Sequence, residues 1–400
     1  MKIAWIAYAF HEYSVLHANA LAENHDVLLL LPKLEAASID LEVSAKVHYH
    51  PFDKPRLRQP LQHWFSVRKL LKIIDDFQPD VVHFQQGHLW FNFALPSLKK
   101  KFPLVITVHD PRHHLGDRES QKTPQWIMDY GFRLADQTIV HGNLLADQVS
   151  MLFGHPKEKI RVIPHVAMGA GVSDFSNSEE EPFNILFFGR IWDYKGLDYL
   201  IQAEPLITEK IPNAKIVIAG TGDDFDKYES KMVHRERFSI HHRWIGDDEQ
   251  ALLFKQAAVV VLPYIEATQS GVVPVAYNYA KPVVATAVGA LPDCVEDGVT
   301  GILVPPRDPK KLADAIVQLL ENPDQRHKMG RSAKAQLERE ASPKSVAEKT
   351  LLVYEEALGR NDQKWFVRDN SMSSSLSEQL ISKSNPKHST VHATTSTEHS

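Results

Sequence analysis

The chain has 400 residues, of which 43% are hydrophobic and 24% are charged. This length exceeds what one hydrophobic core usually supports, so two domains of ordinary composition are expected. The net charge of -5 argues against a general nucleic-acid binder, whose surface should be basic.

The single cysteine, Cys294, excludes an intrachain disulfide and favours a reducing compartment. No segment has the roughly 18 uninterrupted apolar residues of a spanning helix, and the short apolar N-terminus suits a strand better than a signal peptide. The sequence therefore predicts a cytoplasmic protein.

In the first part of the chain, short apolar runs alternate with longer stretches of helical period. This alternation predicts a parallel sheet covered by helices. Strands are expected at 2–8, 26–31, 46–50, 80–84, 104–108, 137–141 and 160–163. A helix is expected at 62–77. Its shared apolar face is predicted to contain Leu61, Phe65, Leu70, Ile73, Ile74 and Phe77.

The alternation stops in a segment of glycines, serines and acidic residues, and then begins again. The second set of strands is expected at 184–189, 214–220, 238–244, 259–263, 282–286 and 301–304. We therefore expect two doubly wound, Rossmann-like α/β domains that bind ligands beyond the carboxyl ends of their strands. The predicted organisation is a first domain (1–168), a linker (169–182), a second domain (183–342), a C-terminal helix crossing back to the first domain (343–361) and a disordered tail (362–400).

The first motif that carries chemistry is FGRIWDYKG, which follows the strand that begins the second domain. Gly189 lets the backbone approach a ligand, Arg190 offers a planar fork of donors, and Lys195 adds a point charge before the next helix. This combination predicts a site for two phosphates. Solvated surface charges are the alternative interpretation for both basic residues.

The second motif follows the strand at 259–263. Its polar turn is expected to place Gln269, Ser270, Gly271 and Val272 around a helix N-terminus, where free amides and the helix dipole attract anions. Glu266 lies just before this turn and could accept hydrogen bonds from sugar hydroxyls. Ordinary helix capping is the alternative role for Glu266 and Ser270.

These motifs resemble glycosyltransferase family 4, a group of retaining enzymes with the GT-B fold. The resemblance covers about residues 1–355 and rests on FGRIWDYKG, IAGTGDD at 218–224, and the block from Glu266 through KPVVATAVGALPDCVEDGVTGILVPPRDP. It implies transfer of a sugar from a nucleotide-diphosphate donor, with Arg190 and Lys195 on the diphosphate and Gly220 in the donor site. The family's second glutamate is replaced here by Val275, and Glu266 is displaced by one position from the first.

The first domain is expected to hold the acceptor and part of the reaction centre. The strand 104–108 ends at His109 and Asp110, and the resemblance implies that His109 contacts the donor sugar. The loop after the first strand contains His11 but lacks the glycines of the family's acceptor loop. His141 is a further candidate at the acceptor side.

Neither a metal nor another cofactor is expected. Asp224 and Asp226 spell a D-x-D, but acidic residues at a predicted helix start are explained by the helix dipole alone. We expect Arg190, Lys195 and the amides near Ser270 to stabilise the departing diphosphate instead. The expected partners are a UDP- or GDP-sugar and a glycan, lipid-linked or small-molecule acceptor, as in polysaccharide biosynthesis.

Three further interpretations stay open. A nucleotide-sugar epimerase or a phosphorylase could use a similar cleft, although neither explains the two motifs together. A nucleotide-sugar-binding protein that has lost catalysis would explain Val275 and the first loop without glycine. Basic residues of the first domain fit either solvated helix faces or peripheral contact with the inner face of a membrane. These are Arg56, Arg58, Arg68, Lys69, Lys72 and 99–101.

Overall fold

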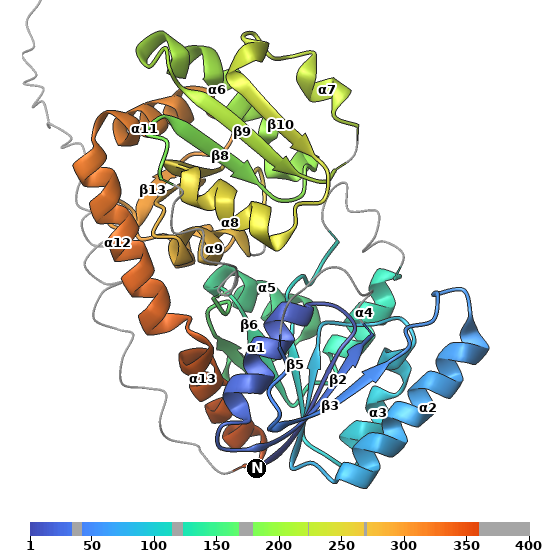
Figure 1. Cartoon of the computed structure of the whole chain (residues 1–400). Coiled ribbons are helices and arrows are strands. Elements are labelled where there is room, and N and C mark those ends of the chain that lie inside the picture. The colour runs from blue at the N-terminus through green and yellow to red at the C-terminus, as the bar shows by residue number, and fades with distance from the viewer. Residues whose placement is uncertain (34–41, 114–122, 168–178, 223, 268–269, 360–400) are drawn as a thin grey trace, which may run out of the picture. The chain divides into compact units, whose positions relative to one another are not determined.

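The computed structural model describes residues 1–33, 42–113, 123–167, 179–222, 224–267 and 270–359 (Figure 1). These residues form two parallel sheets, each covered by helices, as the sequence predicts. Most of the predicted linker and all of the predicted tail lie outside the described residues, as does Gln269.

The first sheet has seven described strands in the order β3-β2-β1-β4-β5-β6-β7, and every neighbouring pair is parallel. Because the strand order reverses between β1 and β4, the loops after these strands diverge and leave room for a ligand. The strands are β1 (Lys2–Ala7), β2 (Asp26–Pro32), β3 (Val47–Phe52), β4 (Val81–Gln85), β5 (Leu104–Thr107), β6 (Gln137–Val140) and β7 (Ile160–Val162). The described helices of this half are α1 (His11–Leu21), α2 (Pro60–Phe77), α3 (Leu95–Lys99), α4 (Gln125–Phe132) and α5 (Asn143–Phe153).

The second sheet has six described strands in the order β10-β9-β8-β11-β12-β13, again all parallel. The reversal here lies between β8 and β11, which are the strands that precede the two motifs. The strands are β8 (Asn184–Phe188), β9 (Lys215–Gly220), β10 (Phe238–His242), β11 (Val259–Leu262), β12 (Val283–Thr286) and β13 (Gly301–Val304). The described helices are α6 (Leu197–Lys210), α7 (Asp226–Glu229), α8 (Asp247–Gln256), α9 (Val272–Asn278), α10 (Leu291–Cys294) and α11 (Pro309–Glu321).

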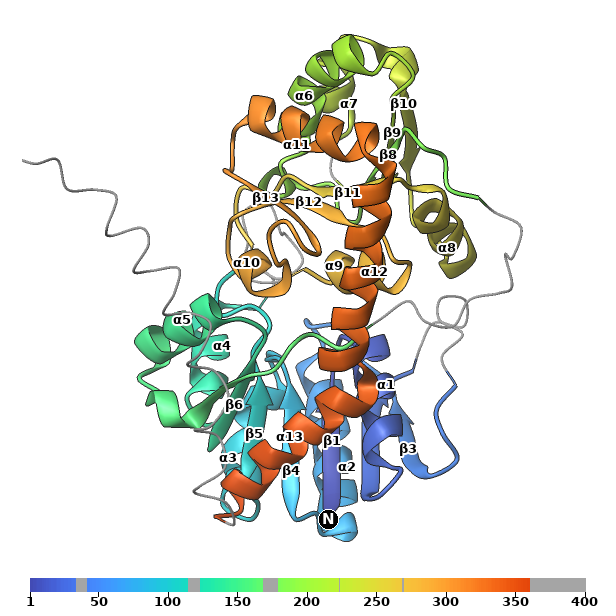
Figure 2. The ribbon, with the colours of Figure 1, turned by 90° about the vertical axis from the view of Figure 1, so that its left-hand side faces the viewer.

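Two long helices complete the described chain, α12 (Pro323–Glu340) and α13 (Pro343–Ala357). Figure 2 shows α13 running along the first sheet, where it packs against α1, β5 and β6. Two polar contacts fix it there: the Tyr354 hydroxyl lies 2.6 Å from Nδ1 of His83, and Arg161 pairs with Glu356 at 3.0 Å. The last helix is therefore part of the first sheet's packing.

The predicted apolar face of α2 is partly wrong. Leu70 and Ile74 are buried together with His63, whereas Leu61 and Phe65 are exposed. Positions 63, 70 and 74 are spaced seven and four residues apart and form one stripe of the helix, while 61 and 65 lie on roughly the opposite side. Helical periodicity alone did not decide which of these two stripes faces the sheet.

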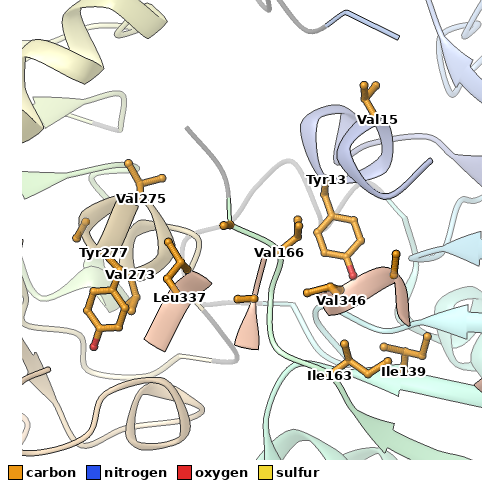
Figure 3. Close-up of a cluster of buried hydrophobic side chains, with 14 of the residues drawn as sticks. Tyr13, Val15, Ile139, Ile163, Val166, Val273, Val275, Tyr277, Leu337 and Val346 are labelled. Atoms are coloured by element: carbon orange, nitrogen blue, oxygen red, sulfur yellow. The ribbon is translucent and has the colours of Figure 1, made fainter. Parts of the chain in front are cut away.

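A buried hydrophobic cluster contains side chains from both sheets and from the last two helices (Figure 3). Tyr13 and Ile163 come from the first half, Val275 and Tyr277 from α9, and Leu337 from α12. Val275, which the resemblance to the family predicts at the position of a second glutamate, is 6% exposed and is a core residue. An unpaired carboxylate at this buried position would be costly, so a valine suits the packing of α9.

Candidate donor site

The end of β8 is built for close approach of the backbone to a neighbouring loop. Gly220, at the end of β9, has φ of +144°, and a Cβ atom there would overlap the carbonyl oxygen of Gly189. The amide of Gly189 donates to the carbonyl of Ala219 at 2.9 Å, and that of Ile191 donates to Thr221 at 2.7 Å. These contacts fix the backbone of the predicted phosphate motif.

The turn that carries Lys195 is attached to the loop after β11. Gly196, which precedes α6, has φ of +68°, and a Cβ atom there would overlap the carbonyl oxygen of Pro263. The amide of Ile265 donates to the carbonyl of Tyr194 at 2.8 Å. The two motifs are separated by about seventy residues in the sequence, but these contacts bring them together into one site.

Lys195 is buried, with 9% of its surface exposed, and its ammonium lies over two aromatic rings. Its Nζ is 3.8 Å from the ring centre of Tyr264 and 5.1 Å from that of Tyr194. Burial lowers the pKa of Lys195 to about 8, so the charged form predominates at neutral pH but is costly. Within the described part of the chain Lys195 forms no salt bridge with a carboxylate. The site therefore holds a desolvated cation suited to an anionic ligand.

Arg190 supplies the second positive charge. Its side chain is exposed, and its guanidinium lies 4.3 Å from the ring centre of Trp192. Arg190 is near enough to Lys195 for its charge to contribute to the lower pKa of that lysine. Two cations at the end of one strand, one fixed and one exposed, suit a diphosphate better than a single phosphate.

The loop after β11 and the start of α9 form the other side of the site. The Tyr264 hydroxyl lies 3.2 Å from Oγ of Ser270, and the amide of Val272 donates to the same Oγ at 3.3 Å. Ser270 thus accepts a hydrogen bond from the first amide of α9, although the N-cap position itself is Gly271. Glu266 is half-buried in the same loop. Thr286 donates to the carbonyl of Tyr264 at 2.7 Å and fixes the loop from β12.

His109 follows the strand β5 at the edge predicted for it. Its side chain is fully buried, a hydrogen bond joins its ring to Gln85, and its amide donates to Oε1 of Gln86 at 2.9 Å. The ring of Phe10 is stacked on it at 3.8 Å. Burial, together with nearby histidines, lowers the pKa of His109 well below its usual range. The imidazole is therefore neutral and suited to hydrogen bonding.

The three residues predicted for the acceptor side lie in different surroundings. Asp110 is half-buried, and its negative charge acts on the pKa of Lys195, which links the first sheet to the turn that carries this lysine. His141 is buried, and its Nδ1 lies 2.8 Å from the carbonyl of Ile163, so Nδ1 carries the proton. Burial lowers the pKa of His141 to about 3. His11 begins α1 and is half-buried.

A cavity of about 170 Å³ connects the first-sheet edge with the start of α9. His141 and His165 line it from the first half of the chain, and Ser270 and Tyr277 from the second. Beside it, the carboxylate of Asp293 accepts a hydrogen bond from the amide of Asn143 at 2.7 Å, at the start of α5. Both sheets thus contribute residues to one region.

Three further buried histidines, His17, His83 and His165, surround His109 and His141. The sequence offered His165 as a weaker candidate next to Pro164 but gave no role to His17 or His83. Their only sequence signal is a histidine inside or next to an apolar run. Among the described residues, no group of histidine, cysteine, aspartate and glutamate side chains is arranged to hold a metal ion. Tyr264 was also missed, although it stands inside the second motif.

Two family models match the chain. Residues 13–166 match Glycosyltransferase Family 4, and residues 182–322 match Glycosyl transferases group 1. The chain belongs to the family 4 glycosyltransferases. This glycosyltransferase is 28% identical over 320 residues to an uncharacterized glycosyltransferase of Methanocaldococcus jannaschii, which covers 73% of this chain and 79% of that protein.

Solved structures agree with this family in their fold. Sucrose-phosphate synthase from Thermosynechococcus elongatus superimposes with a TM-score of 0.68 at 17% identity, covering 90% of this glycosyltransferase and all of that chain. HepE from Anabaena in complex with UDP gives a TM-score of 0.63 at 17% identity, covering 88% and 98%. The fold of the family 4 glycosyltransferase is thus GT-B. No described helix combines the length and the apolar character needed to cross a bilayer.

Proposed function

We propose that this glycosyltransferase transfers a sugar from a nucleotide-diphosphate donor, a UDP- or GDP-sugar, to a hydroxyl of a glycan, a lipid-linked molecule or a small molecule. Transfer would proceed with retention of configuration and without a metal ion. The observation that carries the donor class is the buried cation of Lys195 beside Arg190, at the end of β8 and next to the start of α9. HepE, a structural neighbour, was solved with UDP and supports the same class.

The chemistry follows from where charge develops. Cleavage of the bond between sugar and diphosphate leaves negative charge on the diphosphate, and fixed positive groups lower that barrier. Lys195 and Arg190 would supply this charge. Asp224 accepts a hydrogen bond from the amide of Asp226 at 3.2 Å, as expected for residues at the start of α7. We infer that Asp224 and Asp226 serve the start of α7 and not a metal ion.

His109 would act on the sugar. A neutral imidazole at the end of β5 can exchange hydrogen bonds with sugar hydroxyls but cannot serve as a proton donor at neutral pH. In a retaining reaction the acceptor hydroxyl would attack on the face that the diphosphate leaves, so no protein nucleophile is required. Glu266, half-buried in the loop after β11, is the remaining candidate contact to the donor.

The experiment is a calorimetric titration of the purified protein with UDP-, GDP- and ADP-sugars, with and without EDTA. Binding of one nucleotide series, unaffected by EDTA and lost in Lys195→Met, is expected. A matched control is Lys210→Met, because Lys210 is exposed and pairs with Asp314 on the surface. Product analysis by NMR then tests retention through the anomeric configuration. Epimerised sugar without an acceptor would instead indicate an epimerase, and binding without turnover would indicate a protein that has lost catalysis.

A further inference from the structure

The outward side of α2 carries large apolar side chains where solvent-facing residues are normally polar. Leu61, Trp64 and Phe65 are 73%, 51% and 64% exposed. Their spacing of three and four residues places them on one stripe of the helix, opposite the buried stripe of His63 and Leu70. Single exposed apolar residues are ordinary, but a contiguous group of three marks an interaction surface.

The same stripe continues as a row of positive charges. Arg68, Lys69 and Lys72 follow at the same helical spacing, and all three are exposed. Arg56 and Arg58, also exposed, lie just before the helix. The sequence from 54 to 74 contains no aspartate or glutamate, although the whole chain has a net charge of -5. We call Arg56, Arg58, Leu61, Trp64, Phe65, Arg68, Lys69 and Lys72 the α2 surface.

The cations of the α2 surface are not used by the fold. None of the five forms a salt bridge with another residue in the described ranges, whereas nearby Lys99 and Lys101 pair with Asp136 and Asp75. These two lysines are therefore accounted for by packing within the first half of the chain. The guanidinium of Arg68 lies 4.7 Å from the ring centre of Trp64, and the rings of Trp64 and Phe65 meet edge to face at 4.9 Å.

We propose that the α2 surface binds an anionic lipid membrane, with Trp64 and Phe65 in the interfacial region and the cations at the headgroups. An anionic membrane binds surfaces of this kind, in which apolar and aromatic side chains lie beside unpaired lysine and arginine residues. A second copy of this chain is disfavoured, because a symmetric contact would bring ten unpaired positive charges together. An acidic protein partner would pair with the positive charges. It would need a pocket for the exposed apolar side chains of Leu61 and Phe65, and its acidity alone does not supply one.

On the side opposite the α2 surface, α2 packs against residues that follow β1 and β4. His63, on the inner stripe of α2, lies 5.5 Å from the ring of His88, which is stacked on Tyr8 just beyond β1. If the proposed function holds, membrane binding would bring the enzyme to the surface that holds lipid-linked acceptors. The membrane proposal itself is independent of donor and acceptor, since it concerns binding alone.

The test is sedimentation of the full chain with vesicles of neutral phosphatidylcholine and of phosphatidylcholine containing about 30% phosphatidylglycerol. We expect binding to the anionic vesicles at least tenfold tighter than to the neutral ones, weakening as salt rises. Trp64→Ser with Phe65→Ser, and separately Arg68→Glu with Lys69→Glu, should each weaken binding at least tenfold. All four residues are exposed, so circular dichroism and thermal unfolding should be unchanged.

Matched controls separate the α2 surface from general stickiness. Trp244→Ser removes an aromatic side chain that is 66% exposed in the second half, and Lys310→Glu with Lys311→Glu reverses two exposed charges on α11. Both should bind vesicles like the wild type. No binding to anionic vesicles, or equal loss in the control variants, would overturn the proposal. Dimerisation that is abolished by the Trp64 and Phe65 changes would assign the surface to a second copy instead.

Discussion

The ammonium group of Lys195 lies 3.8 Å from the centre of the Tyr264 ring, although the two residues come from different strand ends. The ring face is electron-rich and attracts the cation, but it does not replace the water that burial removes. The Tyr264 hydroxyl in turn contacts Ser270, beside the start of α9. One aromatic side chain therefore orients both the cation and the polar residue of the candidate donor site.

Replacing Lys195 by methionine should make the free protein more stable while removing donor binding. The pKa of Lys195 is lowered from 10.5 to about 8, so its charge is costly in the folded state at neutral pH. We expect a gain of about 1–3 kcal/mol in the free energy of unfolding at pH 7, measured by urea denaturation. Donor affinity should fall at least a hundredfold. A less stable variant would show that the charge of Lys195 contributes to folding and is not kept for a ligand.

Donor affinity should fall as the pH rises above about 8. In the free protein Lys195 loses its proton as the pH rises through about 8. A bound diphosphate favours the charged form of the lysine and therefore raises the pKa of Lys195. Binding above pH 8 should therefore take up a proton, with affinity falling about tenfold per pH unit. Titration calorimetry in buffers of different ionisation enthalpy measures this uptake. Lys195→Arg stays charged and should remove the dependence, and a flat wild-type profile between pH 7 and 9.5 would contradict the assignment.

The backbone at Gly220 should tolerate no side chain. Its φ of +144° and the overlap of any Cβ atom with the carbonyl of Gly189 predict that Gly220→Ala displaces the end of β8. We expect Gly220→Ala to lower the free energy of unfolding by at least about 2 kcal/mol and to weaken donor binding as well. Thermal unfolding measures the first effect, and titration calorimetry measures the second. Gly246→Ala is the matched control, because a Cβ atom there meets nothing within 4 Å. Its cost should stay within about 1 kcal/mol.

Much of the architecture was predictable because parallel strands have a strong local signal. Apolar runs such as 259–262 and 301–304 appear as strands within a residue or two of their expected ends. The position of Arg190 and His109 followed from the same signal, since a polar residue just after a buried strand lies at the carboxyl edge of its sheet. Roles at such edges can be inferred without knowledge of the tertiary packing.

Properties set by contacts between distant segments were not predictable. Lys195 was expected as a loop charge, but its burial depends on Pro263 and Tyr264, about seventy residues away. The face of α2 was assigned wrongly at Leu61 and Phe65, because the helix has apolar residues on two sides and only tertiary packing decides between them. Val275 became interpretable as a core residue only with the cluster around α9 in view.

Removing the imidazole of His109 should slow turnover without weakening nucleotide binding. His109 belongs to the first sheet, whereas Lys195 and Arg190 belong to the second, so the two sets of contacts are separable. We expect His109→Ala to lower kcat by about a hundredfold and to leave the affinity for free nucleoside diphosphate within about threefold. His48→Ala, on the surface beside Asp26, is the control and should match the wild type in both measurements. Equal loss of nucleotide affinity in His109→Ala would place His109 in the nucleotide site or in the fold.

Glu180, at the entry to the second half, should be the carboxylate on which stability depends most. Its two oxygens accept hydrogen bonds from buried Arg326 at 2.8 Å and buried Lys281 at 2.7 Å. Burial alone would raise the pKa of Glu180, but these two cations outweigh it and lower the pKa below the usual 4.5. Its contribution to stability is therefore present at neutral pH and is lost as the pH falls below about 4.5.

Glu180→Ala leaves two buried cations unpaired and should lower the free energy of unfolding by about 3–5 kcal/mol, measured by urea denaturation at pH 7. Asp314→Ala breaks only an exposed pair with Lys210 and should cost about 0–1 kcal/mol; equal costs for the two variants would show that the buried contacts of Glu180 are not coupled to folding.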